Sequence, residues 1–343
     1  MSYYLLRRLN LFLATSLILI LVLFIATHLF PVNSSFALSG IENPSQAQTQ
    51  KIISDYRLDE GSVSQFMAYL EQRLSGNLGM SVTSKQSVAS ELINVLPASF
   101  ELIIVTAILA LSFGIPIGVM ASLSQDKITQ NSIIAMTLTG YSIPVFWLGL
   151  SLSLWFGVKL GWLPISGQIN LLYEIEPVTG FMLIDTLLSE HSYRYSAFID
   201  ALQHMILPAF TLAVFPFTVV VRLTRSAMMN VMQQTYIRAA EARGLHTSQI
   251  VLKHALPNAL IPVLKNLGIM LGPFASYAIV VEVIFAWPGV GAWLVQGIYQ
   301  RDYTVIQGGI LAVALLIIFF SIVIDIIHTA ANPKTRKEIY ASH

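Results

Sequence analysis

Six long apolar runs divide the chain, and they constrain its fold more than any other feature. They lie at 9–30, 97–123, 133–158, 205–221, 261–285 and 305–330. A helix of about 20 residues crosses the hydrocarbon core of a bilayer, so each run can span it. Hydrophobic residues make up 55% of the 343 positions and charged residues only 11%, against about 25% in a soluble domain. We therefore predict an all-α membrane protein of about six transmembrane helices, in one membrane domain over 1–343.

The first apolar run shares some features with a signal peptide. Arg7 and Arg8 precede it, and the small residues Ala37 and Ser39 follow it. Its apolar core is nevertheless longer than the roughly 7–15 residues of a typical signal peptide. We therefore interpret it as a membrane anchor that is retained.

The basic residues are distributed unevenly between the segments that link the runs. If the N-terminus is cytoplasmic, 12 of the 19 Lys and Arg residues lie inside, with only four of the 18 carboxylates. They include Arg7 and Arg8 and, after the last run, Lys334, Arg336 and Lys337. Such an excess is typical of cytoplasmic segments. Both termini are predicted to be cytoplasmic.

Two long segments, 31–96 and 161–204, then lie on the periplasmic side. In the first, apolar residues at helical spacing predict a surface helix over 62–74. The second is acidic, and an acidic surface can steer a cationic solute or dock a basic partner. An ordinary solvated loop is the alternative. The candidate docking residues are Glu174, Glu176 and Asp185.

The cytoplasmic loop 225–260 contains the most informative stretch of the chain. Small side chains around Ala240 would let another protein approach the helix backbone closely. Gly244 follows, at a position where helices commonly end because glycine accepts a positive φ. Thr247 or Ser248 can cap the next helix. We predict a helix–glycine–helix elbow that fits a groove on a partner, with an ordinary amphipathic helix as the alternative.

The pattern Ala240-Glu241-Ala242-x-Gly244, followed by Leu256-Pro257, resembles the EAA loop of permeases in ATP-binding-cassette (ABC) importers. This resemblance implies the type I importer fold and a coupling helix that docks into a cleft of an ATPase subunit. The residues to which it assigns this role are Arg238, Ala239, Ala240, Glu241, Ala242, Arg243, Gly244, Leu256 and Pro257.

Other segments resemble the dipeptide and oligopeptide permeases of this family. They are Leu96–Leu102, Ser142–Trp147, Leu160–Gly167, His204–Pro208, Phe285–Gly291 and Arg301–Tyr303. The resemblance extends from Arg7 to Pro333. Segment 171–190 is similar to the B-type permease of the Sap branch, which is named for sensitivity to antimicrobial peptides. Asn77, where relatives commonly carry Asp, and residues 31–62 depart from the family pattern.

The resemblance implies transport of peptides, including cationic antimicrobial peptides, across the bacterial inner membrane. It also implies four further subunits or proteins: a second homologous permease, two ABC ATPases that hold ATP and Mg, and a periplasmic solute-binding protein. Two alternatives stay open. One is export of a polyamine such as putrescine by a Sap-like system, and the other is a membrane scaffold that assists potassium uptake.

The chain itself is predicted to be no enzyme and to bind no cofactor, metal or nucleic acid. It lacks the G-x-x-x-x-G-K-[ST] pattern that cradles ATP phosphates, so ATP would bind the partner subunits. It contains no cysteine, and its seven histidines do not lie at metal-ligand spacing. No catalytic arrangement is recognisable. The lack of a carboxylate near the middle of a run argues against a proton-driven carrier.

Pro144 interrupts the run at 133–158 and predicts a kink, because proline donates no backbone hydrogen bond. Together with Phe146 and Trp147, it is a candidate for lining the solute pathway.

Overall fold

The computed structural model describes residues 2–29, 39–40 and 44–331. Positions 31–38 and 41–43 of the first periplasmic segment lie outside the described residues, as do Lys334, Arg336 and Lys337, which were counted for the orientation. The chain forms two compact units, one of residues 1–99 with 288–319 and one of 100–287 with 320–343. The single transmembrane domain expected for 1–343 stays a prediction.

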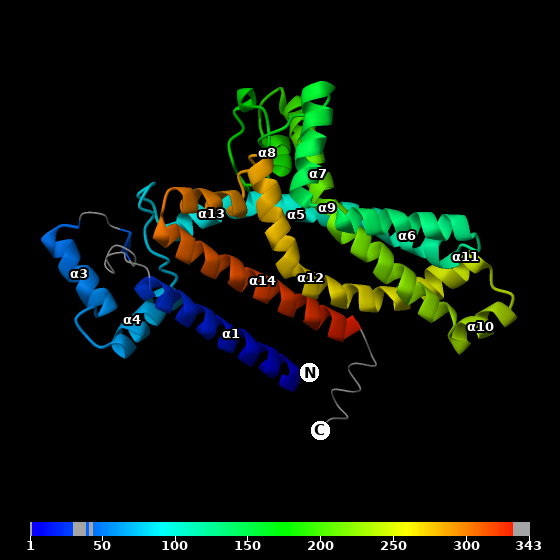
Figure 1. The fold of residues 1–343 in the computed structure, drawn as a ribbon, viewed down its shortest axis with the longest axis horizontal. Coiled ribbons are helices and arrows are strands. Elements are labelled where there is room, and N and C mark those ends of the chain that lie inside the picture. The colour runs from blue at the N-terminus through cyan, green and yellow to red at the C-terminus, as the bar shows by residue number, and fades with distance from the viewer. Residues whose placement is uncertain (1, 30–38, 41–43, 332–343) are drawn as a thin grey trace. The chain divides into compact units, whose positions relative to one another are not determined.

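Helices account for nearly all of the described structure (Figure 1). The described residues contain no β-strand, only an isolated bridge between Met80 and Ser87. Five helices are long and apolar enough to cross a membrane, and six spans result if a bent helix pair is counted as one. The prediction of an all-α membrane protein with about six spans is confirmed.

The long helices coincide with the predicted spans to within one residue or extend beyond them, except that the run at 133–158 is divided between two helices. The long helices are α1 (Ser2–Leu29), α5 (Val88–Leu123), α9 (Arg194–Met232), α12 (Leu256–Ile284) and α14 (Tyr303–Ala331). The bent pair is α6 (Lys127–Ser142) with α7 (Val145–Leu152), which η1 (Ser153–Lys159) continues. The largest extension is in α9, whose 39 residues exceed the span predicted at 205–221. Polar residues at its two ends continue the helix, because leaving lipid does not require a helix to stop.

Shorter helices connect the spans. They are α3 (Gln46–Tyr56), α4 (Ser62–Leu74), α8 (Met182–Leu188), α10 (Thr235–Ala242), α11 (Thr247–Gln249), α13 (Val290–Tyr299), the 3₁₀ turn η2 (Leu171–Tyr173) and the π-helices η1 (Ser153–Lys159) and η3 (Ile250–Ala255). Helix α4 coincides with the surface helix predicted from apolar spacing, which is thereby confirmed.

In the unit formed by 1–99 and 288–319, α3 and α4 pack against α1 through an apolar cluster that includes Phe24, Tyr56 and Tyr69. The ring centroids of Phe24 and Tyr69 lie 5.6 Å apart. The Arg73 guanidinium lies 4.5 Å from the ring centroid of Tyr69, and its Nη1 donates to the Asn77 carbonyl at 2.6 Å. Burial raises the pKa of the Tyr56 phenol. Helices α3 and α4 are thus anchored to the first span by aromatic packing.

Asp302 joins two distant segments of the same unit. It is only 1% exposed. Its Oδ2 accepts from Ser81 Oγ at 2.8 Å, from the Val82 N–H at 2.7 Å and from the Thr83 N–H at 3.2 Å. Its Oδ1 accepts from the Val305 N–H at 3.1 Å, in the first turn of α14, and from Thr304 Oγ1 at 3.2 Å. One carboxylate therefore caps α14 and holds the loop before α5.

In the unit formed by 100–287 and 320–343, glycines let α5 and α6 approach α9 closely. A Cβ atom at Gly118 would lie 2.7 Å from Thr224 Cβ and 2.8 Å from the Val221 carbonyl oxygen. A Cβ atom at Gly140 would lie 2.8 Å from Thr218 Cγ2. These helices pack nearly backbone to backbone, as small residues permit between membrane helices.

We expect Gly118→Val to destabilise the protein by about 1–3 kcal/mol, because α5 and α9 must separate to admit the side chain. Thermal unfolding in detergent measures this effect. Gly272→Ala in α12 is the matched control: a Cβ atom there meets nothing within 4 Å. Equal unfolding temperatures for the two variants would contradict the close packing of α5 on α9.

Helix α6 begins with an ionised cap. Asp126 accepts hydrogen bonds from Thr129 Oγ1 at 2.7 Å and from the N–H groups of Thr129 and Ile128 at 2.9 and 3.1 Å. The Thr129 side chain, followed by these backbone bonds, holds the pKa of Asp126 below its usual value. The cap therefore stays charged at neutral pH and loses its effect only as the pH falls through this lowered pKa.

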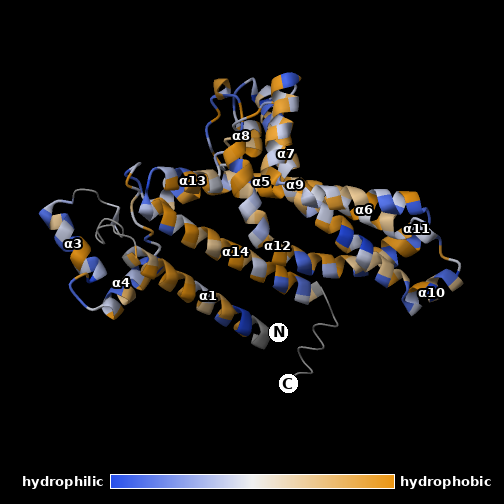
Figure 2. Cartoon of the chain, in the orientation of Figure 1, coloured by the Kyte–Doolittle hydropathy of each residue, from blue (hydrophilic) through white to orange (hydrophobic). Residues whose placement is uncertain are grey.

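Large apolar surfaces remain uncovered by the chain itself. Only 17% of the most apolar stretch of α1 and 6% of that of α14 is buried. Figure 2 shows hydrophobic residues along the length of both helices, whereas hydrophilic residues gather on α3. A bilayer or another apolar surface must cover these helices, because water would not tolerate the exposed area.

Candidate functional site

The elbow predicted within 225–260 is built by a complete glycine-terminated helix end. Helix α10 stops at Ala242, and Gly244 adopts φ +75°. The Gly244 N–H donates to the Glu241 carbonyl at 2.9 Å, and the Leu245 N–H donates to the Ala240 carbonyl at 3.3 Å. This pair of bonds is the Schellman motif, which satisfies the last helix carbonyls. The helix–glycine–helix form expected from the sequence is present.

The next helix is capped by a residue that the sequence analysis did not choose. His246 Nδ1 accepts from the Ser248 N–H at 3.3 Å, and α11 begins at Thr247. The prediction that Thr247 or Ser248 is the cap is wrong by one or two positions. The chain turns at Gly244 in the left-handed conformation, and α11 begins three residues later. Its cap is therefore His246, before the Thr and Ser residues that suggested a cap.

One face of the elbow is locked to the spans. Ile237 and Ala240 of α10 are 0% and 8% exposed, and they lie in one apolar cluster with Met228 of α9 and Ala259 of α12. The remaining members come from α9 and from the π-helix η3: Ala227, Ile250, Val251 and Ala255. A displacement of α10 would therefore be transmitted directly to the adjacent ends of α9 and α12.

The opposite face of the elbow is free. Arg238, Ala239, Glu241, Ala242, Arg243 and Gly244 are all exposed, as is Pro257 at the start of α12. Leu256 is half-buried against the cluster. Small and charged side chains thus form a slender exposed surface on a rigid base. This arrangement fits a shallow groove on a partner protein.

The third apolar run is broken rather than gently kinked. Helices α6 and α7 meet at an angle of 96° across Ile143 and Pro144. Pro144 has no N–H to offer the Gly140 carbonyl, and its ring disfavours a helical residue before it. Phe146 and Trp147, in the first turn of α7, are 54% and 56% exposed. The expected kink is therefore a sharp discontinuity in a span.

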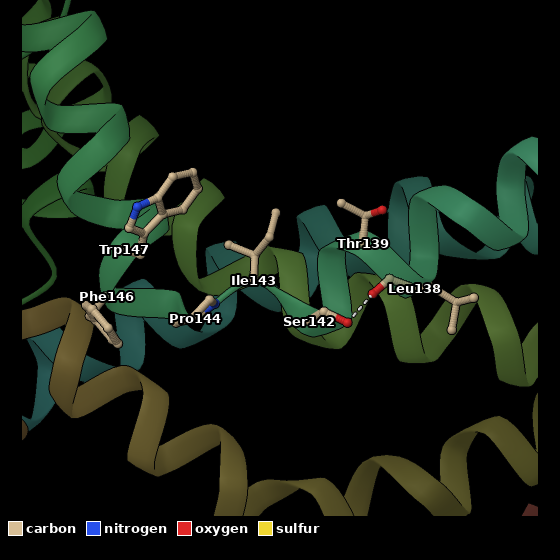
Figure 3. Close-up of a pocket in the computed structure, with 7 residues that line it drawn as sticks. All are labelled: Leu138, Thr139, Ser142, Ile143, Pro144, Phe146 and Trp147. Atoms are coloured by element: carbon tan, nitrogen blue, oxygen red, sulfur yellow. Dashed lines mark hydrogen bonds between the residues drawn. The ribbon is translucent and has the colours of Figure 1, made fainter.

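A groove of about 620 Å³ runs along this break, lined by residues of α6 and α7. Figure 3 shows Trp147, Ile143 and Thr139 on one side of the broken span and Phe146 on the other. Ser142 is the last residue of α6, and its Oγ donates to the Leu138 carbonyl at 2.9 Å. The three candidate pathway residues lie together at this break.

A buried carboxylate anchors the segment 161–204. Glu101 of α5 is 4% exposed and accepts from the Leu183 N–H at 2.7 Å and from the Met182 N–H at 3.2 Å. These are two of the free N–H groups in the first turn of α8. Glu101 lies in the apolar run at 97–123, and the sequence analysis assigned it no role. An isolated carboxylate inside an apolar run was the only signal of this role.

The acidic residues of the same segment have different environments. Glu174 and Glu176 are exposed. Asp185 is 2% exposed, and it accepts from the Thr179 N–H at 2.8 Å, from Thr179 Oγ1 at 2.6 Å and from the Gly180 N–H at 2.9 Å. Asp185 therefore shapes the loop from within. Of the three candidate docking residues, only the two glutamates are exposed to a partner.

We expect Glu101→Ala to detach α8 from α5. Hydrogen bonds to a charged group contribute about 1.5–3 kcal/mol, and the variant leaves two N–H groups unpaired. Hydrogen exchange at the Met182 and Leu183 amides should rise sharply, and periplasmic protease should cut the loop sooner. Glu101→Gln keeps one acceptor oxygen and should show a smaller change. Unchanged exchange in both variants would contradict this anchor.

A model of the family described as binding-protein-dependent transport system inner membrane component matches residues 114–337. The chain belongs to this family. It is thus a multi-pass permease component of the inner membrane, and not an enzyme. The broken span, the elbow and α8 all lie within the matched residues.

Two relatives cover much of this permease. The di/tripeptide transport system permease protein DppB of Pseudomonas aeruginosa is 41% identical over 332 residues, 97% of this chain and 98% of its own. The putrescine export system permease protein SapB of Escherichia coli K12 is 43% identical over 265 residues, 77% of this chain and 83% of its own. The resemblance to dipeptide permeases and to the Sap branch is confirmed.

A solved structure has the same fold. A chain of the MetNI methionine ABC transporter, in inward-facing conformations, superposes with a TM-score of 0.54. It is 18% identical, and the match covers 71% of this chain and 96% of that one. The type I permease fold implied by the coupling loop is confirmed. The described residues contain no group of His, Asp and Glu side chains that could hold a metal ion.

Proposed function

We propose that this permease subunit moves peptides across the inner membrane, driven by ATP hydrolysis on separate subunits. The observation that carries the proposal is the elbow. It presents a small, charged face to the cytoplasm and is packed by Ile237 and Ala240 onto the ends of two spans. A permease that works without an ATPase would have no use for this construction.

The proposed complex contains a second, homologous permease and two ATPases that hold ATP and Mg. Closure of the ATPases pushes the exposed face around Glu241, and the cluster at Met228 passes the displacement to α9 and α12. The spans then alternate between outward-facing and inward-facing states. Of the coupling residues, Arg238, Ala239 and Arg243 contact the partner, whereas Leu256 and Pro257 join the elbow to α12.

A periplasmic solute-binding protein delivers the solute in this scheme. Glu174 and Glu176 are exposed on the periplasmic segment and are candidates for docking it or for steering a cationic solute. Asp185 supports the loop that carries them. The solute then passes the broken span at Pro144, Phe146 and Trp147.

The substrate class is supported by the relative named for di- and tripeptides, which matches 97% of this chain. Export of putrescine is the second candidate, because another relative carries that name. Both candidates use the same architecture and the same coupling.

The test is transport in cells that lack this chain, with and without its restoration. Labelled dipeptide and labelled putrescine are followed in both directions, with an inactive ATPase as the control. ATP-dependent dipeptide entry that needs the chain supports the proposal. Putrescine efflux alone would overturn the substrate and the direction. Transport that persists with the inactive ATPase would overturn the coupling.

A further inference from the structure

At the break between α6 and α7, backbone groups on both sides have no hydrogen-bond partner among the described residues. The carbonyls of Gly140, Tyr141 and Ser142 end α6, and none accepts a hydrogen bond from a described residue. The N–H groups of Val145, Phe146 and Trp147 begin α7, and none donates one, because Pro144 provides no side-chain cap. Acceptors and donors therefore face the same discontinuity.

Such groups are costly in a membrane. Each backbone group left unsatisfied in hydrocarbon costs several kcal/mol, so irregular backbone within a span survives only where protein buries it or where it lines a hydrated cavity. The residues of this break do line cavities. Ser142, Ile143 and Pro144 border both the groove of about 620 Å³ and a smaller cavity of about 130 Å³.

The smaller cavity lies between the break, α9 and α12, and it has an aromatic wall. Tyr141, Phe215 and Tyr277 line it, with ring centroids 5.7 Å apart for Tyr141 and Phe215 and 4.7 Å apart for Phe215 and Tyr277. Thr211 lines it too, but its Oγ1 already donates to the Leu207 carbonyl at 2.7 Å. Ser142 Oγ is likewise engaged with the Leu138 carbonyl, at 2.9 Å. Apart from the two phenolic hydroxyls, the polar groups that remain available in the cavity are those of the backbone.

The charges around the cavity disfavour a bare polycation. No Asp, Glu, Lys or Arg side chain is among the residues that line either cavity. The Arg222 guanidinium lies 5.2 Å from the ring centroid of Tyr141, which lines the smaller cavity. A diamine offers only donors and two positive charges, so it would leave the N–H groups of α7 unpaired and meet Arg222 without a counter-ion. A peptide main chain offers both carbonyls and N–H groups.

We propose that this break is a contact site for the peptide main chain of the transported solute, independent of its side chains. The carbonyls that end α6 accept from peptide N–H groups or from the terminal ammonium. The N–H groups that begin α7 donate to peptide carbonyls or to the terminal carboxylate. The aromatic wall gives an apolar surface that tolerates varied side chains. This proposal rests on the peptide transport proposed above.

The test uses the natural absence of cysteine. Ser142→Cys and Val145→Cys are made separately in the complete complex, reconstituted in vesicles. A charged thiol reagent should label both, because the cavity is hydrated. Alanyl-alanine at about ten times its Kd should slow labelling by about tenfold, and putrescine should not. Gln125→Cys, at an exposed loop position, is the control for labelling without protection, and Ala110→Cys, 2% exposed in α5, should not react.

The outcomes separate this inference from the proposed function, because transport of both solutes is measured in the same vesicles. Absence of labelling at both positions overturns the hydrated break. Labelling without protection, in vesicles that transport alanyl-alanine, overturns the contact site alone. Protection by putrescine instead of the dipeptide overturns the assignment to a peptide main chain. Transport of putrescine without transport of the dipeptide overturns the proposed function.

Discussion

Gly244→Val is expected to reduce transport by about tenfold while the permease still inserts and binds its ATPases. Gly244 adopts φ +75° and terminates the helix that carries Glu241. A residue with a Cβ atom costs about 1–2 kcal/mol in this left-handed conformation, and 1.4 kcal/mol is a factor of ten in an equilibrium constant. The Schellman bonds from Gly244 and Leu245 would be lost in most molecules, and the exposed face would be misplaced.

The control separates backbone strain from steric contact. A Cβ atom at Gly244 meets nothing within 4 Å, so a larger side chain does not collide with this chain. Gly244→Asn is the matched variant, because asparagine tolerates the left-handed region. We expect it to keep most of the transport. ATPase activity, co-purification of the ATPases and solute uptake are measured together. Equal transport by both variants would contradict a role for this conformation.

Asp302→Ala is expected to lower the free energy of unfolding of its unit by about 3 kcal/mol or more, since hydrogen bonds to a charged group contribute about 1.5–3 kcal/mol each. The buried carboxylate receives five hydrogen bonds, three from 81–83 and two from the first turn of α14. Its removal leaves the N–H groups of Val82 and Val305 unpaired. The loop before α5 should then become open to hydrogen exchange.

Asp302→Asn keeps the shape of the side chain but only one acceptor oxygen. That oxygen can serve either the loop at 81–83 or the start of α14, so we expect roughly half of the loss. The amides of Val82, Thr83 and Val305 report which side is released. If the alanine variant unfolds at the wild-type temperature with unchanged exchange, the carboxylate does not hold these segments together.

The apolar runs predicted the membrane environment, the fold class and most of the spans. A helix must have about 20 apolar residues to cross a bilayer, and such a run can be counted in the sequence. The runs at 9–30 and 305–330 are too apolar to be exposed to water, so lipid must surround them. The elbow could be predicted for a similar reason. Its end depends on one local conformation at Gly244, and helix ends obey rules that span only a few residues.

Other features depend on contacts between residues far apart in the chain. Glu101 meets α8 across more than 80 positions, and Asp302 meets Val82 across 220. Asp185 resembled an exposed docking residue, but it is buried by its own loop. Pro144 predicted a kink, but its pattern did not give the 96° angle, and the smaller cavity beside it is completed by residues of α9 and α12. The local sequence determines where a helix ends and so which backbone groups lack a partner within it. Packing between distant segments determines which side chains bind such groups.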